Sequence, residues 1–132
     1  IHDCGTILNP TIVEGQMMGG LAHGIGETLY ERMVYDENGQ YLSASFMDFI
    51  MPSACEIPSV DLLHQETPSP LSPLGVKGAG EGGTLGVCGA LIGAVENALE
   101  PLGIRIRSSP IRCDALARAI KQAMDGGEAV TV

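Results

Sequence analysis

The chain has 132 residues, a formal net charge of −9 and 45% hydrophobic residues, and its 18 glycines are the compositional anomaly. Nucleic acids and anionic membranes attract clustered Lys and Arg, so 7 basic against 16 acidic residues argue against either as the main partner. The length suffices for one ordinary domain and excludes a complete large redox enzyme. We therefore expect a low-charge, glycine-rich domain whose backbone packs closely against another group.

The ends and the cysteines bear on the context of the chain. It opens with Ile1 rather than Met and carries no signal-like segment, which favours one piece of a longer polypeptide. No run reaches the roughly 18 apolar residues that a membrane span needs. The four cysteines, at positions 4, 55, 88 and 113, lack the spacing of a zinc site or an iron–sulfur cluster. They are typical of reduced, mostly buried thiols, so we expect a cytoplasmic protein.

Residues 9–31 are predicted to form a helix. Asn9 suits the N-cap, Pro10 suits the first helical position, and apolar residues recur at near-helical spacing from Ile12 to Leu29. Five glycines lie inside this segment, and each costs about 1 kcal/mol relative to Ala. We therefore expect the surroundings to hold this helix, and its glycine face to let a backbone or a ligand approach closely.

The middle of the chain is predicted to be extended and irregular. Residues 33–35 and 41–42 flank an Asp-Glu-Asn-Gly turn at 36–39, which is a hairpin signal. Residues 60–66 have the pattern of a strand. The prolines at 68, 70 and 73 then predict an irregular segment before the glycine-rich loop.

The last third of the chain is predicted to contain two more helices. An apolar helix is expected from Thr84 to about Leu99, and residues 104–107 alternate like a strand. Ser109-Pro110 is expected to cap a third helix, with Leu116, Ile120 and Met124 on its apolar face, that stops at Gly126-Gly127. Because the elements do not follow a βαβ rhythm, we predict the α+β class.

The loop from Gly75 to Gly86 contains the pattern GxGxxG, at Gly78, Gly80 and Gly83. In dinucleotide-binding folds a buried strand precedes this pattern, whereas a proline-rich segment precedes it here. Glu81 would also lie where a pyrophosphate binds, and like charges at close range are costly. We therefore reject a dinucleotide-binding fold at this loop, and a strand before Gly78 would be needed to restore that fold.

Glu81 is the one carboxylate among the glycines of this loop. A carboxylate held among backbone groups at the entrance of an apolar helix can be desolvated, which favours its protonated form and makes it a candidate general base. A flexible loop with a solvated glutamate explains the composition equally well.

Three motifs resemble, in order, those of one protein family. They are Asp-Cys-Gly-Thr-Ile-Leu-Asn-Pro at 3–10, Glu-Gly-Gln-Met-Met-Gly-Gly at 14–20 with Gly-Ile-Gly at 24–26, and Gly-Val-Lys-Gly-Ala-Gly-Glu at 75–81. Together they resemble the C-terminal part of the molybdopterin-binding large subunits of the xanthine dehydrogenase, aldehyde oxidase and carbon monoxide dehydrogenase family. The resemblance implies that residues 1–132 are an α+β fragment of a molybdopterin cytosine dinucleotide-binding domain.

The resemblance also implies roles for the matched residues. Glu81 falls on the family's catalytic glutamate, which accepts a proton beside the molybdenum. Gln16 falls on a glutamine that hydrogen-bonds the pterin, to which an amide offers both a donor and an acceptor. The implied cofactor-binding residues are Gln16, Gly19, Gly20, Lys77 and Gly80, and no metal ligand is implied in this chain.

The implied function is molybdenum-dependent hydroxylation of an aldehyde or N-heterocycle, or oxidation of carbon monoxide. The cofactor is molybdenum-molybdopterin in its cytosine dinucleotide form. The implied partners are a small-molecule substrate, the remainder of the subunit, and iron–sulfur clusters and FAD on other subunits or domains of an oligomer. The alternative is a non-catalytic module that keeps this fold for subunit contact or cofactor storage, and such a module would tolerate the loss of Glu81.

The remaining histidines, methionines and cysteines are expected to be structural. His23 is predicted to be an interior, hydrogen-bonded histidine rather than a metal ligand. His2 and His64 are expected at the surface or facing a partner. Met17, Met18 and Cys88 are expected to pack in a core.

Overall fold

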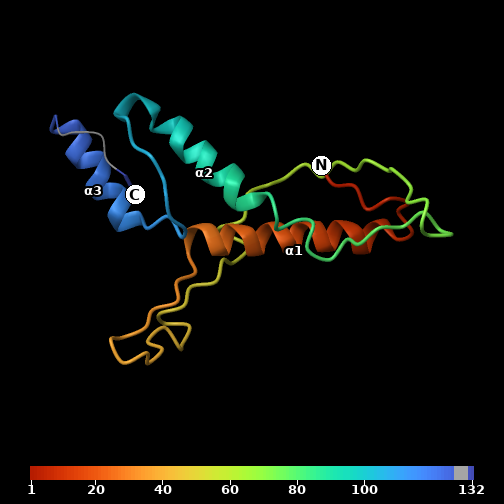
Figure 1. Ribbon diagram of the computed structural model, residues 1–132, viewed down its shortest axis with the longest axis horizontal. Helices are drawn as coiled ribbons and strands as arrows, with labels where there is room; N and C mark the ends of the chain where they lie inside the picture. Colours follow the sequence, from red (N-terminus) through yellow and green to blue (C-terminus); the bar gives the residue numbers. More distant parts are fainter. Residues whose placement is uncertain (127–130) are drawn as a thin grey trace.

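Helix α1 (Pro10–Leu29) is the long axis of the molecule, as the computed structural model shows for residues 1–126 and 131–132 (Figure 1). Helices α2 (Val87–Ala98) and α3 (Cys113–Met124) gather toward its C-terminal end, with the short 3-10 helix η1 (Glu100–Leu102) following α2. Extended segments from residues 1–9 and 60–80 surround its N-terminal end. No helix in this described part of the chain is long and apolar enough to cross a bilayer.

Helix α1 begins where the sequence predicts. The Asn9 side chain accepts a hydrogen bond from the Ile12 amide at 3.2 Å, and Pro10 occupies the first turn, where no amide donor is needed. The helix ends at Leu29, and the Tyr30 amide donates to the Gly26 carbonyl at 2.9 Å. A Cβ at Gly24 would lie 2.5 Å from the Cβ of Val87, so close packing against α2 explains this interior glycine.

The two later helices start further along the chain than predicted. Helix α2 begins at Val87 because the preceding residues form turns, in which the Thr84 amide donates to the Glu81 carbonyl at 3.0 Å. Helix α3 begins at Cys113 with Arg112 as its N-cap, so the predicted cap at Ser109-Pro110 is wrong. The Ser109 hydroxyl instead donates to the Glu27 carbonyl of α1 at 3.3 Å, which ties this residue to α1 four residues before α3 begins.

The C-terminal end of α3 follows the prediction only in part. Its C-cap is Asp125, and Gly126 has a φ of +82°, a left-handed conformation that glycine adopts without strain. Gly127 lies outside the described residues. Met124, predicted on the apolar face, is exposed.

Strand pairing is sparser than the α+β prediction requires. Between the described residues there are four isolated bridges and no longer ladder, of which two join the N-terminal segment to the rest: His2 to His64, parallel, and Gly5 to Val76, antiparallel. Residues 60–66 and 104–107 therefore form no named strands. In residues 104–107 the alternation reflects one-sided burial, because both isoleucines are buried and both arginines exposed.

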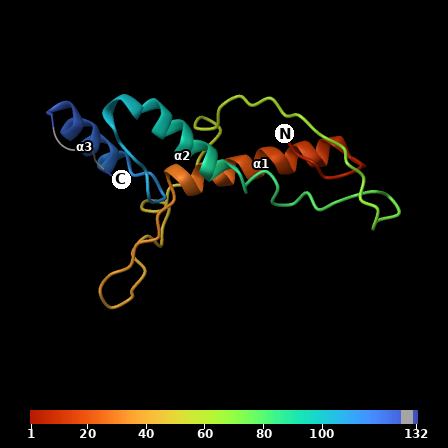
Figure 2. The ribbon, with the colours of Figure 1, turned by 45° about the horizontal axis from the view of Figure 1, so that its top comes forward.

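The predicted hairpin forms a projecting arm. Tyr35 and Tyr41 pair across it, and Gly39 closes its turn with a φ of +81°. Figures 1 and 2 both show the arm, orange to yellow, leaving the body of the molecule at the C-terminal end of α1. Phe46 and Met47 near it are largely exposed.

The buried core lies at the C-terminal end of α1, on the side opposite the projecting arm. Ile104, Ile106, Ile111 and Ala119 form it, with half-buried residues of α2 and α3 packed around them. The Ile111 amide donates to the Thr28 carbonyl at 2.7 Å, which joins this core to α1. The core therefore anchors one end of α1, while the glycine-rich loop runs along its middle.

Candidate functional site

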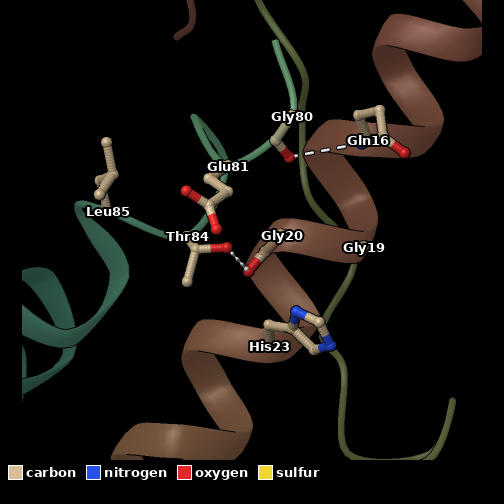
Figure 3. Close-up of a pocket in the computed structure, with 8 residues that line it drawn as sticks. All are labelled: Gln16, Gly19, Gly20, His23, Gly80, Glu81, Thr84 and Leu85. Atoms are coloured by element: carbon tan, nitrogen blue, oxygen red, sulfur yellow. Dashed lines mark hydrogen bonds between the residues drawn. The ribbon is translucent and has the colours of Figure 1, made fainter.

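A cavity of about 460 Å³ lies between the middle of α1 and the glycine-rich loop (Figure 3). Its α1 residues recur at intervals of three and four, so they share one face of the helix. The structure brings together five of the predicted site residues, Gln16, Gly19, Gly20, Gly80 and Glu81; the other lining residues are His23, Thr84 and Leu85.

Two hydrogen bonds and one backbone contact hold the loop on α1. The Gln16 Nε2 donates to the Gly80 carbonyl at 3.4 Å, and the Thr84 hydroxyl donates to the Gly20 carbonyl at 3.0 Å. A Cβ at Gly20 would lie 2.9 Å from the Cα of Gly83. Gly20 therefore lines the cavity, but the space where its side chain would point is occupied by the backbone of the loop.

Gly19 and Gly80 differ from Gly20 in this respect. A Cβ built on either residue would meet nothing within 4 Å, and both residues are exposed on the cavity side. The cavity is thus open above two stretches of bare backbone, one from each wall. A flat group could approach the peptide planes there without meeting a side chain.

Glu81 is exposed in this structure. Its backbone carbonyl accepts the Thr84 amide at 3.0 Å, and Figure 3 shows its carboxylate beside Thr84 at the cavity. The described residues therefore do not supply the desolvation that the sequence predicts. The physical reason is that the neighbouring glycines offer no side chain to cover the carboxylate.

Lys77 lies outside the cavity lining and pairs with Asp3 instead. Its Nζ is 2.9 Å from Asp3 Oδ2. The Lys77 ammonium, followed by the amides of Gly5 and Thr67, holds the pKa of the Asp3 carboxyl well below its usual range. Sequence reasoning assigned no role to Asp3, although an aspartate in the first motif and a lysine in the third were the available signal.

His23 lies at the surface rather than in the interior. It is exposed and lines the cavity, so the predicted interior histidine is wrong. Its spacing of seven residues from Gln16 places both on the same face of a helix, and this spacing was the signal that could have found it.

His2 and His64 are also less exposed than expected. Their paired segments bury the Nε2 of His2 and both ring nitrogens of His64, and these atoms have no hydrogen-bond partner. The His2 ring lies against the backbone of Gly82, where a Cβ would collide with it. His2 thus packs against the loop that carries Glu81, and His64 pairs with His2.

The cysteines and the other described residues that could bind a metal lie outside the site or are dispersed. Cys4 is buried, Cys88 is half-buried, and Cys55 and Cys113 are exposed, so the prediction of mostly buried thiols is wrong for the last two. Across residues 1–126 and 131–132, no group of three or more His, Cys, Asp or Glu side chains could hold a metal ion. Residues 67–79 form only turns and the one bridge at Val76, which excludes the dinucleotide-binding alternative because that fold needs a strand before Gly78.

Comparisons with known proteins agree with this geometry. Residues 1–58 match the model of a molybdopterin cofactor-binding domain. The chain is 41% identical over 125 residues to the nicotine 6-hydroxylase large subunit of Paenarthrobacter nicotinovorans, covering 95% of this chain and 15% of that one. It is 43% identical over 98 residues to the carbon monoxide dehydrogenase large chain of Afipia carboxidovorans, covering 74% and 12%. The structure of quinoline 2-oxidoreductase from Pseudomonas putida 86 superposes with a TM-score of 0.86 at 42% identity, covering 91% of this chain and 15% of that one.

The fold and the matched domain define the class as that of molybdopterin cofactor-binding domains. The chain belongs to the family of molybdenum-binding large subunits that includes carbon monoxide dehydrogenase and xanthine dehydrogenase, as the three motifs predict. It spans about 15% of the length of the relatives that it matches.

Proposed function

We propose that this chain forms one wall of the molybdenum–pterin site of a hydroxylating oxidoreductase and supplies the base of that site, Glu81. The observation that carries the proposal is a single cavity that unites Gln16 and Gly19 on α1 with Gly80 and Glu81 on the loop. These are the residues that the family motifs mark, and they come from segments 64 residues apart.

The walls of the cavity fit a pterin. The bare backbone at Gly19 and Gly80 leaves room for a flat ring system, and a side chain at either position would fill that room. The Gln16 carboxamide combines a donor and an acceptor at the same wall. Its contact with the Gly80 carbonyl is long, at 3.4 Å, so a better-placed acceptor on the pterin could replace it.

Glu81 is suited to the proton transfer that hydroxylation needs. When bound, the molybdenum group accepts the two electrons that hydroxylation of a substrate carbon by water releases. Two protons are released as well, so the site needs a base. Glu81 is the one carboxylate among the residues that line the cavity, and the glycines on both sides of it leave its oxygens uncrowded. A base positioned in this way contributes about 10²–10⁴-fold to the rate.

The finer assignments complete the proposal. We infer the cytosine dinucleotide form of the pterin, and iron–sulfur and flavin groups on partner subunits or domains as the acceptors of the electrons. The matched relatives are named as large subunits or large chains, which supports further subunits. The substrate is an aldehyde, an N-heterocycle or carbon monoxide. The four cysteines are free thiols, which supports the cytoplasm as the compartment.

The test is the variant Glu81→Gln in the holoenzyme. The proposal expects turnover to be lost while molybdenum remains bound. The alternative, a module that stores the cofactor or mediates subunit contact without catalysis, expects no change in any measured property.

A further inference from the structure

The Asp3 carboxylate joins three segments of the chain. Its Oδ1 accepts the amides of Gly5 at 2.8 Å and Thr67 at 3.1 Å. Its Oδ2 accepts the Nζ of Lys77 at 2.9 Å. One side chain therefore fastens the N-terminal segment to residues 64–67 and to the start of the glycine-rich loop.

Backbone hydrogen bonds run in parallel with these side-chain contacts. His2 exchanges two with residues 63–65, at 3.0 and 2.9 Å, and residues 4–6 exchange two with residues 75–77, at 2.7 and 3.1 Å. A Cβ at Gly5, where φ is +69°, would collide with the Gly75 carbonyl, so the two segments lie as close as backbones can. The N-terminal segment is therefore the support on which the loop begins.

Lys77 is the last side chain fixed by an ion pair before Glu81. Between them lie Gly78, Ala79 and Gly80, and glycine loses more conformational freedom on ordering than any other residue. The nearest contact on the far side, from Gln16 to Gly80, is long. The position of Glu81 thus depends strongly on where Lys77 is held.

We propose that Asp3 and Lys77 are positioning residues for Glu81, and that Lys77 acts through Asp3 rather than by contact with the cofactor. The inference rests on the proposed function, in which Glu81 is the base. The Lys77 side chain is paired with Asp3, and neither residue lines the cavity. The pKa of the Asp3 carboxyl is lowered from its ordinary value of 3.8, chiefly by Lys77, so Asp3 carries its negative charge at neutral pH.

The pair should matter for position more than for overall stability. The side chains of Lys77 and Asp3 are 36% and 30% exposed, and ion pairs with this much solvent contribute little to global unfolding. A displacement of a catalytic group by a fraction of an ångström to one ångström, in contrast, slows a reaction by tenfold or more.

The experiment compares Lys77→Met, Asp3→Asn and the double variant in the holoenzyme that contains this chain. Asp3→Asn keeps an acceptor for the two amides and removes the charge. We expect each variant to lower kcat about tenfold with little change in KM and in bound molybdenum, and the double variant to be no worse than either. Hydrogen exchange at the amides of Lys77 and Thr84, which donate to the Cys4 and Glu81 carbonyls, should accelerate in all three variants. Lys77→Arg keeps the ion pair, so its kcat and its exchange rates should match those of the wild type. Arg118→Met, which breaks an ion pair of the same 2.9 Å length on α3, is the control and should change neither.

Two results would overturn the inference. One is a kcat within twofold of the wild type together with unchanged exchange at the amides of Lys77 and Thr84. The other is loss of molybdenum from Lys77→Met but not from Asp3→Asn, which would make Lys77 a cofactor contact. Failure of the proposed function is a different result, because the Glu81→Gln enzyme would then remain active. In that case hydrogen exchange still reports whether the Asp3–Lys77 pair holds the loop.

Discussion

Gly20 of α1 and Gly83 of the glycine-rich loop meet backbone to backbone. A Cβ at Gly20 would lie 2.9 Å from the Cα of Gly83 and 3.0 Å from the Thr84 amide nitrogen, and a Cβ at Gly83 would lie 2.6 Å from the Met17 carbonyl oxygen. Backbone atoms cannot yield as a flexible side chain can. The two glycines therefore set the distance between the helix and the loop, and with it the width of the cavity.

Gly20→Ala is expected to destabilise the protein, although alanine is the better helix former. The added methyl group would force the loop away from α1, and overpacking of this kind costs about 1–3 kcal/mol. Gly15→Ala, on the same helix but with nothing within 4 Å of its Cβ, should instead stabilise by up to about 1 kcal/mol. The thermal midpoints of the two variants therefore move in opposite directions, and a rise for both would contradict the contact.

Gly19→Leu is expected to lower the amount of bound pterin. Its side chain would enter the open space of the 460 Å³ cavity without meeting protein atoms, so the fold itself should tolerate it. Gly15→Leu, one turn earlier and outside the cavity lining, is the matched control and should keep its cofactor. Molybdenum and pterin content of the purified holoenzymes is the measurement. Equal content in both variants would mean that the pterin binds elsewhere.

Glu81→Gln is expected to reduce turnover by about 10²–10⁴-fold, because the amide has nearly the same shape but accepts no proton under working conditions. Molybdenum content should stay near the wild-type value. Glu14→Gln removes an exposed carboxylate of α1 outside the cavity and should leave kcat unchanged. Near wild-type kcat in the first variant would remove Glu81 from the base role.

The Asp3 carboxyl should make stability depend on pH in the acid range. Its folded pKa is lowered, chiefly by Lys77, below the ordinary value of 3.8. The contribution to stability is therefore fully present above about pH 4 and fades as the pH falls below 3.8 toward the folded pKa. Thermal midpoints of the wild type and Asp3→Asn should differ by a small amount at pH 6, because the pair is partly exposed, and converge in strong acid. A gap that widens on acidification would contradict the assignment.

The 132 residues expressed alone should show no redox activity and should self-associate. One wall of a cofactor site leaves many polar groups of a pterin without partners. Phe46, Met47, Leu71 and Leu85 are each at least 79% exposed, and apolar surface of this kind promotes association. The checks are metal content, oligomeric state and reduction of an artificial electron acceptor. Stoichiometric molybdenum with turnover would show instead that the site is complete in this chain.

Features with local causes could be predicted from the sequence. Asn9 and Pro10 fix the start of α1 through their own side chains. The turn at 36–39 is likewise local, because the Asp36 carboxylate accepts two nearby amides and Gly39 takes the positive φ. The irregular course of the proline-rich segment follows in the same way, whereas α1 ends at Leu29, two residues before the end predicted from the sequence.

Features with long-range causes could not be predicted. The sequence predicts that Gly20 contacts the cofactor, but in the structure the loop backbone occupies the space next to its Cα. The sequence predicts that Ser109 caps a helix, but in the structure its hydroxyl donates to the carbonyl of Glu27, 82 residues earlier. The strand expected over 60–66 shrinks to one bridge because its neighbour is the short N-terminal segment rather than a long partner strand. The pairing of Asp3 with Lys77 likewise spans 74 residues.

The different surroundings of the glycines along α1 restrict insertions and deletions within this helix. Gly19 faces the open cavity, whereas Gly20 and Gly24 face the loop and α2. An α-helix turns by about 100° per residue, so one inserted or deleted codon before Gly19 would rotate every later position out of phase with its neighbour. Gly20 and Gly24 would leave the contacts that need them, and larger residues would enter. Natural variants of this helix should therefore differ by substitution and keep its length, whereas the exposed turn at 36–39 can gain or lose residues freely.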